Sequence, residues 1–380
     1  MHAVKIRDLQ ARLLDIPFRL RFKHHAANRS RTQTLLVRTR TLAGQVGFGE
    51  GCPREYVTGE TLESCLGFVK RHAFSLTEEI CTLDDLKGWL EHHEQDIDSN
   101  PAAWCAVELS LLDAISKDLG QNIEELLSAP TISGEFAYTA VLGDTSDAVL
   151  SKLVSQYVQM GFDDFKVKIT GDADTDNKKL ELVHKAAPDA RLRLDANNIW
   201  RTPEDVLLYL DALTLRPFAL EEPLGAREFD VLNRLLARTS VPIILDESFL
   251  NKHHLNPINT EYDNVIVNVR VSKMGGLIRA RAVARLLSVA GIPLVIGAQV
   301  GETSLLTRAG LSIANEFKDH VLAQEGAFGT LLLETDITNE PLMFGPRGRL
   351  IWPGVGTNAS VNGMEIRYKS NLFGAIQSGT

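Results

Sequence analysis

The sequence has few features of a membrane-bound or secreted protein. No uninterrupted apolar run approaches the roughly 18 residues of a membrane-spanning helix. The first residues, MHAVKIRDLQ, contain neither the apolar stretch nor the cleavage site of a signal peptide. Four cysteines are present, but none has the CxxC spacing of a zinc knuckle, and nothing suggests a disulfide framework. We therefore expect a cytoplasmic protein without a membrane partner.

Positive charge is also scarce. The chain has 40 Lys and Arg against 49 Asp and Glu, a formal net charge of −9, and its basic residues form no stripe. Proteins that bind nucleic acid or anionic membranes concentrate positive charge, so both are excluded as expected partners. What the chain does contain is an ordinary globular composition, 44% hydrophobic and 23% charged over 380 residues. That length is enough for two cores.

The most informative pattern is a series of three acidic residues. Asp195, Glu221 and Asp246 each end a short apolar run, and they lie 26 and 25 residues apart. One strand, one helix and two loops take about 25 residues, so this spacing predicts equivalent positions on successive strands of a parallel barrel. The three carboxylates are therefore expected to converge.

Lysines extend this series at both ends. Lys166 and Lys168 alternate within DDFKVKI and share one face of a predicted strand, 27 residues before Asp195 in the case of Lys168. Lys273 follows Asp246 by 27 residues. The order along the chain is lysine, acid, acid, acid, lysine.

The acidic series predicts a metal site. Three half-buried carboxylates repel one another unless a cation lies between them. Oxygen ligands alone, with no His or Cys in the series, favour Mg²⁺ over Zn²⁺. A single acidic residue at a strand end more often caps a helix or forms an ion pair, but the shared spacing favours ligands. We expect Asp195, Glu221 and Asp246 to bind Mg²⁺, with Mn²⁺ as an alternative ion.

The rest of the chain alternates between strand and helix patterns. From AYTAVLG (137–143) to HVLAQEG (320–326), eight β-rich runs alternate with amphipathic helical segments. This alternation is typical of a parallel barrel rather than an open sheet. Residues 1–130 instead read as strands followed by three main helices, which predicts a separate α+β domain.

These motifs together resemble the enolase superfamily. The resemblance is carried by Lys166-Val-Lys168, Asp195-Ala-Asn197, Glu221-Glu-Pro, Asp246-Glu-Ser and Lys273-Met-Gly-Gly, and it runs from GQVGFGEG (44–51) through the barrel. It is closest to the muconate lactonizing (cycloisomerase) subgroup. The resemblance implies an α/β fold with a (β/α)₇β modified TIM barrel over 131–345, an N-terminal α+β capping domain over 1–130, and a C-terminal segment, 346–380, that returns to the capping domain. It also implies a homo-oligomer.

The predicted site suggests proton chemistry on a small-molecule carboxylate. A bound metal ion makes the proton α to a carboxylate more acidic, because it stabilises the charge of the enediolate that forms. Lys168 and Lys273 are expected to approach from opposite sides as acid and base. Lys166 would lower the pKa of Lys168, Asn197 would support the ligands, and Glu247 would pair with Lys273.

The reaction itself stays open at this point. Two opposed bases suit racemisation or epimerisation, whereas one active base suits cycloisomerisation, and we expect a magnesium-dependent isomerase of one of these kinds. The alternative is β-elimination by a dehydratase or a succinylbenzoate synthase-like lyase. A non-enzymatic scaffold is disfavoured, because none of the motif residues is lost.

The resemblance also implies that two loops and two strand ends set the substrate specificity. Loops 19–32 and 50–60 should close over the barrel mouth, and their basic character would suit a second anionic or polar end of the substrate. For the loop histidines, a solvated surface role is the competing interpretation. Dipeptide epimerases carry an Asp-x-Asp pair where this chain has Ala323-Gln324-Glu325, which argues against a dipeptide substrate. The predicted substrate-binding residues are His24, Arg54, Tyr56, Gln299 and Glu325.

Overall fold

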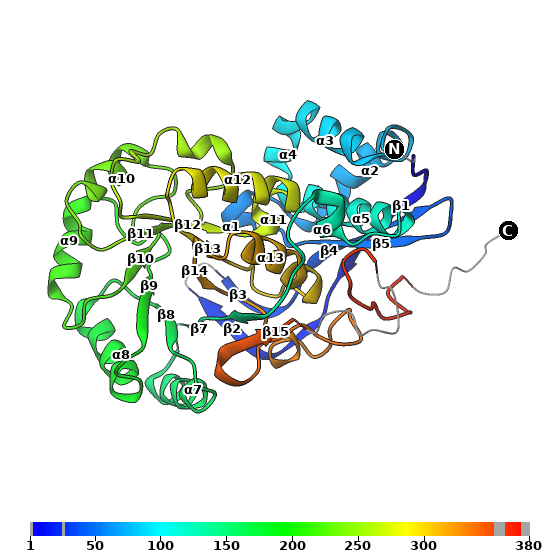
Figure 1. The fold of residues 1–380 in the computed structure, drawn as a ribbon. Coiled ribbons are helices and arrows are strands. Elements are labelled where there is room, and N and C mark those ends of the chain that lie inside the picture. The colour runs from blue at the N-terminus through cyan, green and yellow to red at the C-terminus, as the bar shows by residue number, and fades with distance from the viewer. Residues whose placement is uncertain (1–2, 25–26, 144, 353–361, 374–380) are drawn as a thin grey trace.

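The fold is that of a computed structural model, which describes residues 3–24, 27–143, 145–352 and 362–373; the side chains of residues 20–29 are not described. Within these ranges, no helix combines the length and apolarity needed to span a bilayer. Two parts lie side by side, an N-terminal α+β part and a larger barrel (Figure 1).

The N-terminal part is built on an antiparallel sheet of order β1-β4-β5, with strands Ile6–Leu14, Thr34–Thr41 and Val46–Gly51. Six helices follow: α1 (Glu55–Thr58), α2 (Leu62–Glu79), α3 (Leu83–His92), α4 (Glu94–Ser99), α5 (Pro101–Asp118) and α6 (Ile123–Leu127). Three of them, α2, α3 and α5, have ten residues or more. This agrees with the three main helices predicted.

Helix α5 packs directly on strand β5 because that strand carries alternate glycines. A Cβ atom at Gly47, Gly49 or Gly51 would overlap the backbone carbonyl of one α5 residue; these are Ser110, Ala106 and Ala102 in turn. Steps of two residues along the strand therefore match steps of four along the helix, which is one helical turn. The close approach leaves α5 buried over almost its whole length.

The two segments predicted as specificity loops contain regular structure. Most of 19–32 is a hairpin of β2 (Pro17–His24) and β3 (Ala27–Arg31), which pair antiparallel with His24 opposite Ala27. Segment 50–60 contains the short helix α1. Neither segment is therefore a simple loop.

The barrel consists of eight parallel strands in sequence order. They are β7 (Ala140–Leu142), β8 (Asp164–Lys168), β9 (Arg191–Asp195), β10 (Ala219–Glu221), β11 (Ile243–Leu245), β12 (Val265–Val269), β13 (Leu294–Ile296) and β14 (Val321–Gln324). The sheet curls on itself, and the Thr139 N–H beside β7 donates to the Gln324 carbonyl on β14 at 2.7 Å. This contact joins the first strand to the last and confirms the predicted barrel class.

Helices surround the strands (Figure 1). They are α7 (Asp147–Gln159), α8 (Ala173–Ala186), α9 (Pro203–Ala212), α10 (Phe229–Leu236), α12 (Leu277–Val289) and α13 (Ser304–Glu316). The connection after β11 differs from the prediction, since its described residues form only a 3-10 helix, η1 (Lys252–Leu255). A short helix, α11 (Val271–Met274), precedes α12. After β14 the described residues form η2 (Gly329–Leu331), η3 (Pro346–Gly348) and β15 (Arg349–Ile351). Strand β15 pairs with β6 (Glu135–Ala137).

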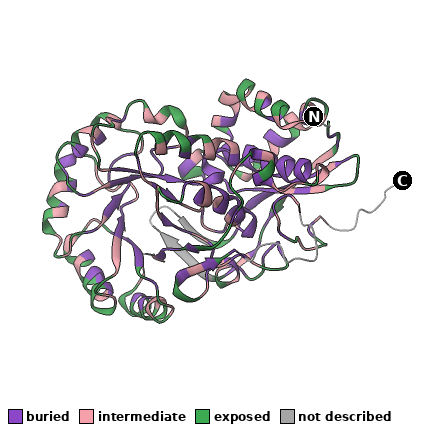
Figure 2. Ribbon diagram, viewed as in Figure 1, coloured by how far each residue is buried: buried purple, intermediate pink, exposed green. Residues whose placement is uncertain are grey.

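Burial follows this architecture. The barrel strands are mostly buried, whereas the outer faces of the surrounding helices are exposed (Figure 2). A small cluster inside the barrel consists of Ala219, Ile244, Ile266, Val295 and Ala323. A second, much larger core is continuous between the barrel and the N-terminal part, so the two pack through apolar side chains.

Residues 362–373 contact the N-terminal part. The Met364 N–H donates to Asp113 Oδ1 at 2.8 Å, and the Gly363 N–H donates to the Gln121 carbonyl at 2.9 Å. Arg308 of α13 donates to the Met364 carbonyl at 2.8 Å and forms a buried ion pair with Glu124 of α6 at 2.7 Å. The barrel, the N-terminal part and this segment therefore meet at Arg308.

Candidate active site

The three predicted metal ligands lie at neighbouring strand ends. Asp195 is the last residue of β9 and Glu221 the last of β10, and they are paired in register. Asp246 directly follows β11. All three carboxylates are buried. The regular spacing in the sequence thus places them on one edge of the sheet.

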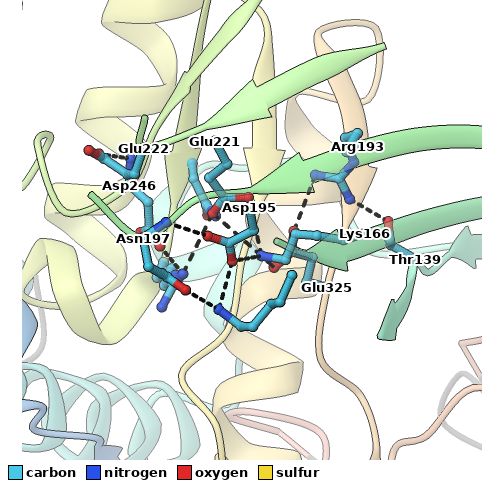
Figure 3. Close-up of polar contacts among 12 residues, drawn as sticks. Thr139, Lys166, Arg193, Asp195, Asn197, Glu221, Glu222, Asp246 and Glu325 are labelled. Atoms are coloured by element: carbon cyan, nitrogen blue, oxygen red, sulfur yellow. Dashed lines mark hydrogen bonds and ion pairs between the residues drawn. The ribbon is translucent and has the colours of Figure 1, made fainter. Parts of the chain in front are cut away.

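Lys166 lies among these carboxylates (Figure 3). Its Nζ is 3.5 Å from Asp195 Oδ2, 3.2 Å from Glu221 Oε2 and 2.7 Å from Glu325 Oε2. Although burial opposes the charge, Glu221 and Glu325 raise the pKa of Lys166 above its ordinary value. Lys166 is therefore a fixed ammonium group that links three strands.

Lys168 ends β8 on the same strand face and lies on a cavity wall. Its Nζ donates to Asp195 Oδ2 at 2.9 Å and also to Asn197 Oδ1. Against the cost of burial, the ammonium groups of Lys168 and Lys166 hold the pKa of Asp195 below its ordinary value. Asn197 has a positive φ of 44°, an uncommon conformation for a residue other than glycine that is often found at functional sites.

Lys273 does not reach the cavity, contrary to the sequence prediction. It lies in α11, one turn beyond the end of β12, and its side chain is 0% exposed. The Nζ donates to the Asp246 carbonyl at 2.7 Å, to Asp246 Oδ1 at 2.8 Å and to the Asn268 carbonyl at 2.7 Å. Burial lowers its pKa. Lys273 thus holds the Asp246 side chain from within the protein core and does not face the cavity.

Arg270 takes the position that the prediction gave to Lys273. It is the first residue after β12, it lines the cavity, and β12 lies four strands from β8 in the eight-stranded order. Arg270 and Lys168 are therefore on opposite walls. One guanidinium nitrogen of Arg270 donates to Gln299 Oε1 at 2.9 Å and the other donates to Asp246 Oδ2. Sequence reasoning missed Arg270, although its place directly after a strand matches that of Asp246.

Glu247 lines the cavity but does not pair with Lys273. Its Oε1 accepts from Asn197 Nδ2 at 3.5 Å, and its buried Oε2 has no hydrogen-bond partner in the described structure. Burial, together with the negative charge of Asp246, raises the pKa of Glu247 to about 8. The predicted pairing is therefore replaced by a contact with Asn197.

The cavity has a volume of about 830 Å³, within the usual range for small-molecule sites. Of the predicted substrate-binding residues, Tyr56, Gln299 and Glu325 line it. Arg54 does not, because its guanidinium is buried against backbone carbonyls, among them those of Pro53 and Thr32. Arg54 therefore anchors its own segment rather than a substrate.

The side chain of His24 lies outside the described residues. The adjacent His25, which the sequence places in the same basic segment, lies wholly outside them. The predicted role of His24 in substrate binding therefore remains a prediction.

Both carboxylate oxygens of Glu325 are already engaged. One accepts from Lys166, and the other accepts from Arg193 NH1 at 3.2 Å. Arg193 also donates to Thr139 Oγ1 at 2.7 Å (Figure 3) and contacts Asp164. Sequence reasoning missed this buried arginine, which alternates with Asp195 on one face of β9.

A third missed residue, Glu222, holds the strand end that carries Asp246. Its side chain accepts from the Ser248 N–H at 2.7 Å and from the Ser248 hydroxyl at 2.9 Å. Asn198 donates to the same carboxylate at 3.1 Å. Glu222 and Asn198 both have positive φ, 41° and 64°, so the backbone next to the site is strained.

The donor set fits a hard divalent cation. In the described residues, no three His, Cys, Asp or Glu side chains are grouped so that they could hold a metal ion. Lysine and arginine side chains contact the carboxylates instead. The oxygens nevertheless share neighbours: Lys166 contacts Asp195 and Glu221, and Arg270 lies 3.9 Å from Glu221 while bonded to Asp246. Burial raises the pKa of Glu221 to about 8 despite Lys166, with Glu325 adding to the effect. A cation bound beside Glu221 would favour the charged form of this carboxyl group.

Comparison with known proteins agrees with the resemblance found in the sequence motifs. A family model described as enolase C-terminal domain-like matches residues 149–356. The chain is 26% identical over 340 residues to an N-succinyl-L-Arg/Lys racemase of Bacillus cereus, covering 88% of this chain and 90% of the relative.

Two solved structures extend the similarity over nearly the whole fold. A dipeptide epimerase of Enterococcus faecalis V583, complexed with Mg and the dipeptide L-Leu-L-Tyr, superposes with a TM-score of 0.81 at 23% identity, covering 96% of this chain and 100% of that one. A 2-chloromuconate cycloisomerase of Rhodococcus opacus 1CP superposes with a TM-score of 0.80 at 23% identity, covering 96% and 97%. The chain therefore belongs to the enolase C-terminal domain-like family, in agreement with the resemblance of its motifs to the enolase superfamily.

Proposed function

We propose that this protein is an isomerase that removes the proton α to the carboxylate of a small substrate, with Lys168 as the base. The observation that carries the proposal is the position of Lys168 on the cavity wall, next to the buried carboxylates at the ends of β9 and β10. A positioned lysine can act as a general base when the proton lies within hydrogen-bond reach. Asn197 accepts from the same ammonium group and would orient it.

Asp195, Glu221 and Asp246 would hold a divalent metal ion, for which we propose Mg²⁺. When bound, the ion would stabilise negative charge on the substrate carboxylate and make the α-proton more acidic. Lys166 would remain a fixed ammonium group, since three carboxylates surround it. Asn268 donates to Glu221 Oε1 at 3.1 Å and Lys273 donates to Asp246, so each would orient one ligand.

Arg270 would act as a permanent cation on the wall opposite Lys168. Its guanidinium stays protonated, so it can attract a substrate carboxylate but cannot take a proton from carbon. In the described part of the cavity wall, the lysines are Lys152, Lys166 and Lys168, and none of them lies on β12. This differs from the two opposed lysines that the sequence predicted.

Two outcomes of proton abstraction remain as candidates, each with its own support. The names of the relatives, a racemase and several epimerases, favour racemisation or epimerisation. Arg270 in place of a second lysine favours a reaction confined to one face of the substrate, as in cycloisomerisation. β-Elimination uses one-face chemistry too and would be recognised by loss of a leaving group.

The test is exchange of the α-proton in deuterated water. N-acyl amino acids, dipeptides, proline derivatives and lactone-forming dienoates would be screened with Mg²⁺ present, and deuterium incorporation followed by NMR. Lys168→Met should reduce exchange at least about 100-fold, the lower bound for loss of a general base. Lys178→Met removes an exposed lysine of α8 and should leave exchange unchanged.

The products of the reaction distinguish epimerisation from cycloisomerisation. Deuterium in both stereoisomers supports epimerisation, whereas a cyclised product without stereoisomer exchange supports cycloisomerisation. Full activity in Lys168→Met would rule out the assignment of the base.

A further inference from the structure

The barrel lacks a helix after its last strand, within the residues described. Beyond β14 the chain runs through η2 and irregular backbone from 326 to 344, next to α7 (Figure 1). The backbone N–H of Arg347 donates to the Met160 carbonyl at the end of α7, which fixes the two segments together. Both α7 and residues 327–344 line the cavity, and the space between them is called the gap below.

The cavity extends from Lys168 into this gap. Val149, Leu153 and Tyr157 line it from one face of α7, at intervals of four residues. Phe328, Leu332 and Phe344 line it from the other side. The end of the cavity away from the carboxylates is therefore mostly apolar, although Ser146, Lys152 and Gln156 also line the cavity.

This apolar end also opens to solvent. Val149 is 48% exposed and Leu331 is 39% exposed, and both line the cavity. Large apolar side chains exposed together are characteristic of a binding site. The channel is thus accessible from outside and continuous with the polar site.

Charges at the cavity wall are confined to its polar end and its rim. Glu325 has no free oxygen, because Lys166 and Arg193 occupy both. Glu302 accepts from the Gln299 N–H at 2.7 Å, and Glu247 faces Asn197. Lys152 is exposed on α7. In the described wall, neither α7 nor residues 327–344 contribute a carboxylate, so a cationic group between these two segments would find no partner from them.

We propose that the substrate carries an extended, uncharged apolar group, which lies between α7 and residues 327–344 while its carboxylate lies beside Lys168. The inference rests on the proposed function for the location of the carboxylate. An apolar chain would exclude water from the channel, and each buried methylene strengthens binding by about fourfold. A group with a terminal ammonium would lose this gain, since burying an unpaired charge is costly.

A series of ligands tests the length and charge of this group. The probes are N-acetyl, N-hexanoyl, N-decanoyl and N-(6-aminohexanoyl) derivatives of one amino acid, with binding measured by calorimetry on the full-length protein with Mg²⁺ present. Affinity should rise at least tenfold from acetyl to decanoyl. The 6-aminohexanoyl derivative should bind at least tenfold more weakly than the hexanoyl derivative of the same chain length.

Matched variants test the location. Leu153→Gln places an amide in the channel, and Leu208→Gln makes the same change at a 73% exposed position on α9. Leu153→Gln should remove most of the gain from acetyl to decanoyl, whereas Leu208→Gln should retain it. Val149→Gln, at the exposed mouth, gives a second variant that does not disturb the core.

The outcomes separate this inference from the proposed function. Chain-length-dependent binding that Leu153→Gln abolishes supports the channel, even if no probe undergoes proton exchange; in that case the proposed reaction fails and the channel stands. Equal affinity across the series, or equal effects of Leu153→Gln and Leu208→Gln, would overturn the channel even if exchange is fast. The same holds if the 6-aminohexanoyl derivative binds as well as the hexanoyl derivative.

Discussion

Glu50 is a buried carboxylate at the junction between the N-terminal sheet and the barrel. It lies on β5, and its oxygens accept from the backbone N–H of Thr303 at 3.2 Å and from its hydroxyl at 2.6 Å. Thr303 is the N-cap of α13, and its own side chain accepts from the Leu305 N–H. One carboxylate thus fixes the start of a barrel helix to the N-terminal sheet.

The pKa of Glu50 makes stability depend on pH. Burial raises it from 4.5 to about 8, with Glu302 and Asp336 adding to the shift while Thr303 opposes it. Between these values the unfolded chain loses the proton that the folded chain retains, so the free energy of unfolding falls as pH rises from about 4.5 to about 8.

Glu50→Gln should remove this contribution. The difference in unfolding free energy between wild type and variant should therefore change by up to several kcal/mol between pH 5 and pH 8, at about 1.4 kcal/mol per pKa unit. Denaturant unfolding at several pH values measures it. Glu91→Gln, an exposed change on α3, should keep the wild-type slope. Parallel curves for wild type and Glu50→Gln would contradict the assignment.

At single positions, the sequence predicted best where side chains end strands. Lys166, Lys168, Asp195 and Glu221 follow the two-residue alternation and the strand–helix repeat, so their clustering could be expected. Lys273 could not be placed correctly from spacing, because β12 ends four residues earlier and the chain turns into α11. Because of this single helical turn, Lys273 lies in the core next to Asp246 and not on the cavity wall. Counting from the end of the strand would have identified Arg270.

Among the contacts between elements, the packing of α5 on β5 tolerates substitution least, because it requires glycine at alternate positions of the strand. A Cβ atom at Gly49 would overlap the Ala106 carbonyl and the Ser110 backbone, neither of which can move without displacing α5. Because the residue is buried between a strand and a helix, the change cannot be relieved by side-chain rotation. This contact therefore sets how far the N-terminal sheet lies from its main helix.

Gly49→Ala should destabilise the protein by about 1–3 kcal/mol or more, the usual cost of overpacking a core. Gly88→Ala provides the control, since Gly88 lies in α3 with no atom within 4 Å of an added Cβ. That change should stabilise the protein by up to about 1 kcal/mol through helix propensity. Thermal unfolding of both variants measures the contrast. Equal shifts in one direction would show that the close packing is not the cause.

The order of strands and helices was largely predictable, whereas two connections were not. The alternation of apolar runs identified all eight barrel strands. The charged segment 21–31 has no apolar alternation, and β2 and β3 are instead held by backbone pairing that composition does not reveal. After β11, Asn251 caps a short 3-10 helix and Pro257 follows soon after, so no α-helix is formed there.

For the whole molecule, metal binding should couple to folding. A ligand that binds only the folded state raises the free energy of unfolding, by about 2.7 kcal/mol at a hundredfold excess over Kd. Adding Mg²⁺ should therefore raise the Tm of the wild type, and removing it with a chelator should reverse the shift. Differential scanning calorimetry measures this without any substrate.

Asp195→Asn should greatly reduce the Mg²⁺-dependent shift, because it removes one anionic ligand. Asp319→Asn, at an exposed position before β14, should retain the full shift. A shift of equal size in both variants would place the ion elsewhere in the molecule.

The bond between the Met364 N–H and Asp113 has a consequence for biosynthesis. The two residues are 251 positions apart, so at 5–20 residues per second the ribosome needs roughly 13 to 50 seconds to make the partner of a helix already synthesised. Throughout that interval Asp113 Oδ1 lacks the Met364 N–H that donates to it in the folded protein. Packing of the N-terminal layer against residues 362–373 is therefore completed only after the barrel has been synthesised.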